Sequence, residues 1–239
     1  MVSVMSEVEV KAEKIYKREL FRKIIKTSLL FLLVIISIIY LVLYVVYQNG
    51  RFTVTLDKNL SNRKNVFLSE EGNVKEKTRH LAAETIDYMD NISIKWLPNT
   101  LDQEGNGSHN GDNYIAYSFY VVNGGNENVH YWFEIDIDDS IKRVDEAIRI
   151  MIYRNGESIV YAKKSAVTGE AEPDTKKFVS ESIAVLEQRK DFKPKQKDRY
   201  TIVVWIEGDD PECKNELLGG EIKLHADITE EHLDGKKKK

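Results

Sequence analysis

The sequence predicts an all-β protein, an antiparallel β-sandwich of the immunoglobulin-like or jelly-roll type, preceded by a single transmembrane helix. Three observations support this prediction. Apolar and polar residues alternate with a period of two in several segments after residue 91. Asn-Gly-Gly, Asn-Gly and Gly-Gly sequences, which are typical of turns, separate these segments. One earlier run, residues 27–47, contains no charged residue, proline or glycine.

The apolar run is long enough to cross a bilayer. Its 21 residues would form a helix of about 30 Å, which is the thickness of the hydrocarbon core. The preceding segment, residues 1–26, carries seven basic and four acidic residues. Basic residues beside a span resist translocation, so we expect this end to stay in the cytoplasm and the C-terminal part to be exported.

A cleaved signal peptide is the alternative interpretation, because it has the same order of basic and apolar residues. The apolar run is longer than the usual signal core, and no A-x-A-like cleavage site follows it. It ends near Tyr44 and Tyr47, which suit the membrane interface. We therefore expect an uncleaved anchor in the cell membrane, with a single pass and an extracellular C-terminal domain.

Composition narrows the function of the exported part. The chain has 35 basic and 39 acidic residues, of which seven basic and four acidic residues lie in the first segment. The exported part therefore has 28 basic and 35 acidic residues, a net charge of −7. This balance argues against a nucleic-acid partner, which calls for a basic face. Cys213 is the only cysteine, so no intrachain disulfide can form. An exported domain without disulfides favours a bacterial surface protein, of Gram-positive origin.

The exported part divides into three regions. Residues 48–90 are expected to form a stalk or linker, with a possible short strand over 52–56 and a helix over 77–89. Residues 91–228 are expected to form the sandwich, and 229–239 a polar tail that ends in four lysines.

Within the sandwich, two segments alternate as half-buried strands do. In 130–138, Tyr131, Phe133, Ile135 and Ile137 share one face, so Asp136 on the other face should be replaceable with little effect. Residues 221–228 alternate in the same way, with Ile222, Leu224, Ala226 and Ile228 on the inner face. The remaining predicted strands are 113–122 and 200–207, which are apolar on both faces, 147–153 and 158–162, which Asn155 and Gly156 join as a hairpin, and 182–186.

Three stretches carry a resemblance. They are 107–117 (GSHNGDNYIAY), 144–149 (VDEAIR) followed by YRNGE, and 204–213 (VWIEGDDPEC) followed by LGGEIK. The chain resembles a group of uncharacterised exported proteins of Gram-positive bacteria, and its sandwich is distantly similar to the TasA and camelysin type of surface and biofilm-fibre domain. The resemblance covers about residues 90–228. TasA-type proteins carry a cleaved signal, so an anchored chain is not expected to polymerise as they do.

One loop has the composition of a calcium site. Asp102, Glu104 and Asn106 place oxygen donors at alternate positions before Gly107, and Asp112 could add a carboxylate. Asn113 occupies the twelfth position, where calcium loops use a bidentate glutamate. Asp209 and Asp210 could join if the loops meet. The alternative is a turn-rich connection whose side chains bond to its own backbone.

No residue pattern predicts an enzyme. The five histidines are scattered and no H-E-x-x-H, G-x-S-x-G or phosphate-binding loop occurs. Cys213 lies among acidic residues that disfavour a thiolate. Trp132 alternates with polar neighbours, which makes it a candidate contact for a sugar ring, although core packing explains most aromatic residues.

The expected function is therefore non-enzymatic, a structural or protein-interaction module at the bacterial surface. The alternatives are a module that binds carbohydrate or cell-wall polymer, and a camelysin-like metalloprotease. Two histidines converging with a carboxylate would favour the protease. A flat aromatic groove around Trp132 would favour the sugar-binding module, and an open edge strand would favour a protein partner.

Overall fold

The computed structural model describes residues 7–48 and 52–231. These residues form two compact units, the helix before residue 50 and the domain from residue 51. Most of the predicted polar tail, including His232, lies outside the described residues. The side chains of Tyr44 and Tyr47 also lie outside the described part.

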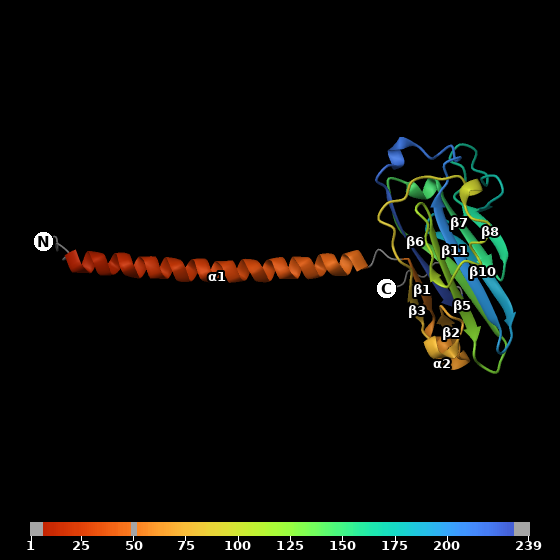
Figure 1. Ribbon diagram of the computed structural model, residues 1–239, viewed down its shortest axis with the longest axis horizontal. Helices are drawn as coiled ribbons and strands as arrows, with labels where there is room; N and C mark the ends of the chain where they lie inside the picture. Colours follow the sequence, from red (N-terminus) through yellow and green to blue (C-terminus); the bar gives the residue numbers. More distant parts are fainter. Residues whose placement is uncertain (1–6, 49–51, 232–239) are drawn as a thin grey trace. The chain divides into compact units, whose positions relative to one another are not determined.

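The first unit is one helix, α1 (Glu7–Gln48), drawn in red and orange in Figure 1. Within its segment 14–42, which has no buried residue, an 18-residue window reaches a mean hydropathy of 2.5, and the helix is long and apolar enough to cross a membrane. The hydroxyls of Thr27 and Ser37 donate to the carbonyls of Lys23 and Leu33, at 2.8 and 2.9 Å. These polar groups need no water as a partner, which suits an apolar surrounding. A signal sequence would share the length and composition.

The second unit contains two β-sheets (Figure 1). The five-stranded sheet has the order β10 (Ile183–Phe192), β6 (Val129–Ile141), β12 (Glu221–Thr229), β1 (Thr53–Leu56) and β3 (His80–Ala82). The seven-stranded sheet has the order β2 (Val66–Ser69), β5 (Ile115–Asn123), β11 (Lys197–Ile206), β7 (Ile148–Arg154), β8 (Glu157–Ala162) and β9 (Lys176–Lys177), and β4 (Gly107–Ser108) also pairs with β5.

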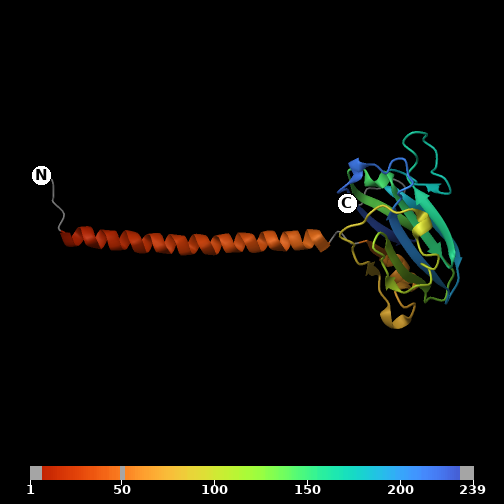
Figure 2. The same ribbon diagram turned by 45° about the horizontal axis from the view of Figure 1, so that its top comes forward.

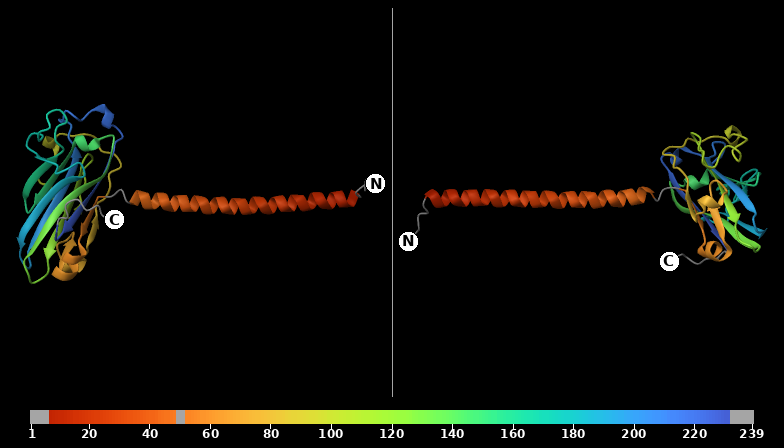
Figure 3. Two further views of the ribbon diagram at one scale, coloured as in Figure 1. Left: turned by 180° about the vertical axis from the view of Figure 1, so that it is seen from behind. Right: turned by 60° about the horizontal axis from the view of Figure 1, so that its bottom comes forward.

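Short helices lie in the connections, namely α2 (Lys58–Lys64), η1 (Val74–Glu76), η2 (Ile94–Trp96), η3 (Val144–Glu146) and η4 (Asn215–Leu217). Asp57 caps α2 by accepting from the backbone N–H of Asn59 at 2.6 Å. α2 and the longer loops lie at opposite ends of the domain in the views of Figures 2 and 3.

The prediction of a mostly β, sandwich-like domain after an apolar helix is confirmed, but the sheets are mixed. β1 runs parallel to β12, with Val54 paired to Ala226, and β8 runs parallel to β9. The prediction that all strands of the sandwich are antiparallel is therefore wrong. A parallel pair needs a long connection, and here almost the whole domain separates β1 from β12.

The described part of the predicted stalk, residues 52–90, belongs to the domain, and the short strand predicted over 52–56 forms there as β1. β1, β2 and β3 belong to the two sheets, and Val54, Leu60 and Leu68 are fully buried. The predicted helix over 77–89 does not form; His80–Ala82 is strand β3 instead. Leu81 pairs with Val54 there, and the N–H of Ala83 bonds to the carbonyl of Phe52 at 2.9 Å.

The predicted inner faces of β6 and β12 do face the core. Tyr131, Phe133, Ile135, Ala226 and Ile228 are completely buried, and Ile137, Ile222 and Leu224 pack against the same cluster. The predicted hairpin joins β7 and β8 through Asn155 and Gly156, whose φ angles of 54° and 90° are those that a two-residue turn between strands requires.

Candidate functional site

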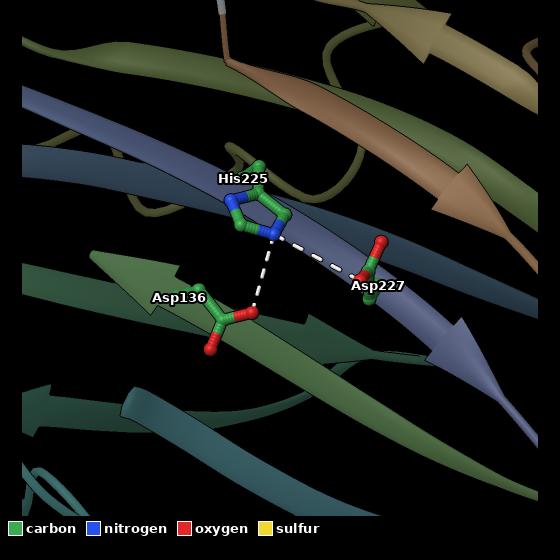
Figure 4. Close-up of side chains that lie close together, drawn as sticks. All are labelled: Asp136, His225 and Asp227. Atoms are coloured by element: carbon green, nitrogen blue, oxygen red, sulfur yellow. Dashed lines mark ion pairs between the residues drawn. The ribbon is translucent and has the colours of Figure 1, made fainter. Parts of the chain in front are cut away.

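Charged side chains gather on the outer face of the five-stranded sheet. Because Ala226 and Ile228 of β12 point into the core, the strand's alternation turns His225 and Asp227 to the other face. The register sets His225 opposite Asp136 of β6. Figure 4 shows the imidazole between the carboxylates of Asp136 and Asp227. One oxygen of each acid and one ring nitrogen lie within 4.8 Å of one another.

Both ring nitrogens of His225 contact carboxylates. Nε2 lies 3.2 Å from Asp136 and 3.8 Å from Asp227, and Nδ1 lies 2.9 Å from Asp138. The hydrogen bond to Asp136 raises the pKa of His225 to about 9, with further contributions from Asp138 and Asp227, while partial burial opposes the rise. The ring is therefore an imidazolium at neutral pH.

This charge state decides what the cluster can do. A histidine binds a metal ion through a neutral ring nitrogen, and His225 at neutral pH has a proton on both. Its positive charge offsets the repulsion among three carboxylates that the sheet holds together. The arrangement favours an electrostatic clamp between β6 and β12 over a metal centre.

In the predicted calcium loop, residues 102–113, a positively charged side chain from β11 contacts the loop's oxygen atoms. The guanidinium of Arg199 donates to the carbonyl of Gly105 and, at 3.5 Å, to Oδ1 of Asn106. Glu104 accepts from the hydroxyl of Thr100 at 3.1 Å, and Asp112 is exposed.

Asp102 faces elsewhere, into a hollow of about 250 Å³ lined with Tyr153, Asn155 and Arg199. Among the described residues, Asp102, Glu104 and Asp112 do not form a group of carboxylates close enough to share an ion. The three predicted carboxylate ligands are thus not brought together, and Arg199 supplies positive charge beside Asn106. The hollow is smaller than most ligand pockets.

The three tryptophans differ in exposure. Trp132 is half-buried on β6, and the register places the polar residues Gln188 and Thr229 beside it, so its neighbours do not extend an aromatic surface. Trp205 is buried and donates its Nε1–H to Glu207 at 3.0 Å. Trp96, on η2, is 74% exposed. The exposure of Trp96 was not predicted from the sequence. The segment around it shows no strand alternation, and this could have indicated that the side chain is not part of the core.

The histidines do not form a metalloprotease site within residues 7–48 and 52–231. His109 bonds through both ring nitrogens to backbone carbonyls, and His130 accepts the N–H of Asp191 at 3.1 Å. No group of possible metal ligands in these residues contains two histidines. Burial and the nearby Asp210 and Glu207 raise the pKa of Cys213, which disfavours its thiolate.

The structure also contains a cluster that sequence reasoning did not find. Glu172, Asp210 and Glu212 are all buried, and one carboxylate oxygen of each lies within 4.8 Å of the others. Asp210 was recognised as a possible ligand, but only as a partner of the 102–113 loop. Nothing local to residue 172 indicates that it meets residues 210 and 212.

Comparison with known proteins assigns no family. No protein-family model matches the chain, and no curated protein does. A β-glucosidase from Kluyveromyces marxianus in complex with glucose aligns at a TM-score of 0.27 and 13% identity, over 71% of this chain and 16% of that one. The selenomethionine-labelled β-glucosidase aligns at a TM-score of 0.25 and 11% identity, with the same coverage. The chain thus spans about one sixth of these structures, and the likeness is too weak to support any argument about function.

Proposed function

We propose that this protein is a membrane-anchored extracellular module of the bacterial cell surface, with a structural or protein-interaction role. The observation that carries the proposal is the apolar run of the helix from residue 27, which is exposed at every described side chain, residues 27–42. Such a surface is stable only in an apolar environment. The basic residues before the apolar run favour the orientation with the N-terminus inside.

The exported domain belongs, in this proposal, to the immunoglobulin-like or jelly-roll class of sandwiches, with a distant relation to the TasA and camelysin type in Gram-positive bacteria. Its two layers and disulfide-free composition support this assignment. The exposed Trp96 is the best candidate contact for a protein partner, since tryptophan is enriched at binding hot spots.

Binding of cell-wall polymer is the second candidate, because an exposed indole can also stack on a sugar ring. Addition of a partner strand to the sheet edge has less support. The ten-residue edge strand β10 is interrupted by irregular pairing near both ends and carries the charged Arg189 and Lys190. A metalloprotease has less support, because no cluster of possible metal ligands among the described residues contains two histidines.

Protease treatment of intact cells that produce the full chain tests the anchor and its orientation. The C-terminal domain should be digested, leaving a membrane-bound fragment of about fifty residues, while a cytoplasmic marker protein stays intact. Recovery of a soluble chain that begins near Gln48 would contradict the anchor. Protection of the domain would contradict the orientation.

Sedimentation with purified cell walls, and cross-linking in intact membranes, separate the two roles. Trp96→Ala should reduce binding in one of these assays, and Trp132→Ala should leave it unchanged. Cross-links to proteins that disappear in Trp96→Ala would support the interaction module. Sedimentation with walls that disappears in the same variant would support the polymer module.

A further inference from the structure

Two loops bring three carboxylates together inside the domain. Glu172 comes from the connection between β8 and β9, and Asp210 and Glu212 come from the connection between β11 and β12. Their exposed fractions are 8%, 5% and 8%, and one oxygen of each lies within 4.8 Å of the others. Each carboxylate has therefore left most of its water and gained two negative neighbours.

The positive charge near this cluster is insufficient. Arg149 donates to Oδ2 of Asp210, and both side chains are buried, with exposed fractions of 6% and 0%. No other ion pair to the three acids occurs among the described residues. Lys163, on the same connection as Glu172, pairs with Asp145 and Glu181 instead, each at 2.6 Å. Three carboxylates and one guanidinium leave two negative charges uncompensated in a buried place, which is costly.

Two oxygens of the cluster have no partner in the described part of the chain. They are Oε1 of Glu172 and Oε2 of Glu212, and both are buried. The other oxygen of Glu212 accepts the N–H of Ala166 at 3.1 Å, and Oδ1 of Asp210 accepts the N–H of Glu212 at 2.7 Å.

Glu207 shows the usual arrangement for a buried acid in the same region. It is 6% exposed, and its two oxygens accept three N–H groups, from Ile94, Trp205 and Asp209. The unpartnered oxygens of Glu172 and Glu212 are therefore a property of their cluster and not of acids at this end of the domain. Buried polar atoms without a partner call for a ligand.

We propose that Glu172, Asp210 and Glu212 bind a calcium ion. The uncompensated charge equals that of a divalent cation, and the available donors are hard oxygens, which calcium prefers. A proton shared between two of the carboxylates would satisfy one such contact and leave one negative charge. Calcium accepts carboxylates from flexible loops with irregular geometry, whereas magnesium requires a near-ideal octahedron.

The ion would cross-link two loops that are far apart in the sequence. Within the described residues, Glu212 touches the β8–β9 connection through the N–H of Ala166 and the hydroxyl of Ser165, the latter at 3.5 Å. With a single cysteine, the chain has no disulfide to fasten these loops. A bound cation would have that role, and it would stabilise the folded state by mass action.

Calcium titration of the full chain in detergent, after treatment with chelator, tests the proposal. Equilibrium dialysis with radioactive calcium should give one bound ion per chain. The melting temperature should rise by about 5–10 °C at a hundredfold excess of calcium chloride over the dissociation constant. Magnesium chloride at the same concentration should give a smaller rise.

Three variants locate the site. Glu172→Gln should weaken binding by about tenfold, because it removes one charged ligand. Glu172→Gln with Glu212→Gln should abolish the response and melt no lower than the chelator-treated parent, since the amides keep the volume and lose the repulsion. Glu170→Gln, an exposed acid on the same connection, should respond as the parent does.

Several outcomes would overturn the proposal. These are no calcium bound to the parent chain at about 10 mM, an equal response to magnesium, or an unchanged response in the double variant. A response that is lost in Asp102→Asn with Asp112→Asn, and kept in Glu172→Gln, would move the site to the 102–113 loop. The dialysis of the parent decides the proposal even if the double variant fails to fold.

Discussion

The ring of Phe133 stacks on the ring of Tyr200, with the centroids 4.7 Å apart and the planes 15° from parallel. Phe133 belongs to β6 in the five-stranded sheet and Tyr200 to β11 in the seven-stranded sheet, so this contact joins the two layers. Tyr200 stacks in turn on its cross-strand neighbour Phe119, at 5.6 Å. Three aromatic rings thus form a continuous contact through the centre of the sandwich.

Phe133→Ala should therefore destabilise the domain severely. Removal of a buried phenylalanine ring costs about 3–5 kcal/mol, from the lost burial and the cavity that remains. This is a large fraction of the stability of an ordinary domain. Urea denaturation of the full chain in detergent measures the change. Asp139→Asn, an exposed position on the same strand, is the control and should change little. Equal losses in the two variants would contradict the assigned faces of β6.

The stability of the domain should depend on pH through His225. Its pKa is about 9 in the folded protein, raised from the ordinary 6.5. The stabilisation is therefore fully present below pH 6.5, and it is lost as the pH rises through 9. Unfolding midpoints of the parent should fall between these pH values more than those of His225→Gln. A parallel fall in both proteins would contradict the role of the imidazolium.

Asp136→Asn tests how much Asp136, among the three carboxylates around His225, contributes to the raised pKa of the histidine. It removes the hydrogen-bond partner that contributes most to the raised pKa, so the pKa of His225 should fall towards its ordinary value. An NMR titration of the His225 ring in the full chain measures this directly, with Asp139→Asn as the control. The expectation from sequence that Asp136 is replaceable with little effect is revised, because its carboxylate lies 3.2 Å from Nε2 of His225.

Asp198→Ala should cost about 3 kcal/mol, the lower end of the loss for one partner of a buried ion pair, because Asp198 is buried while Arg189 is partly exposed. Asp198 is 2% exposed and accepts from Tyr131, Arg189 and Asn155, at 2.8, 2.8 and 2.9 Å. Its loss leaves the buried Tyr131 hydroxyl without this acceptor and removes the carboxylate that faces Arg189. Tyr131→Phe, which removes one hydrogen bond, should cost about 1–2 kcal/mol. Urea midpoints that rank the two variants in the opposite order would argue against the network.

Trp96 should dominate the quenching of tryptophan fluorescence by acrylamide. It is 74% exposed, whereas Trp205 is completely buried. In the folded full chain, Trp96→Phe should remove most of the quenchable emission, and Trp205→Phe should leave it. Trp132→Phe should have an intermediate effect, since that residue is half-buried. Equal quenching after Trp96→Phe would mean that the η2 segment is covered.

Much of the strand content could be predicted because alternation is local. A half-buried strand needs apolar residues at every second position, and β6 and β12 show this pattern within a few residues. Asn155-Gly156 marks its hairpin for the same local reason. β2 could not be found in this way, because its apolar run, residues 66–68, is only three residues long and shows no alternation.

The positions of the functional residues depended on long-range contacts. The spacing of Asp102, Glu104, Asn106 and Asp112 resembled a calcium loop, but Arg199 of β11 donates into that loop. Position 199 is remote in the sequence, so the loop's composition cannot reveal it. Trp132 was a candidate sugar contact because it alternates with polar residues along its strand. Its neighbours on the adjacent strands are Gln188 and Thr229, which are not aromatic, so no aromatic surface continues from it.

The sequence by itself determined the apolar helix, seven strand segments of the sandwich and the absence of an intrachain disulfide, since each depends on residue type or on local periodicity. Only the tertiary structure decided that β1 enters the five-stranded sheet beside β12, and that Glu172 meets Asp210 and Glu212. Both contacts join residues that are far apart along the chain. They follow from how the two sheets pack and where the connecting loops end, and no local pattern encodes them.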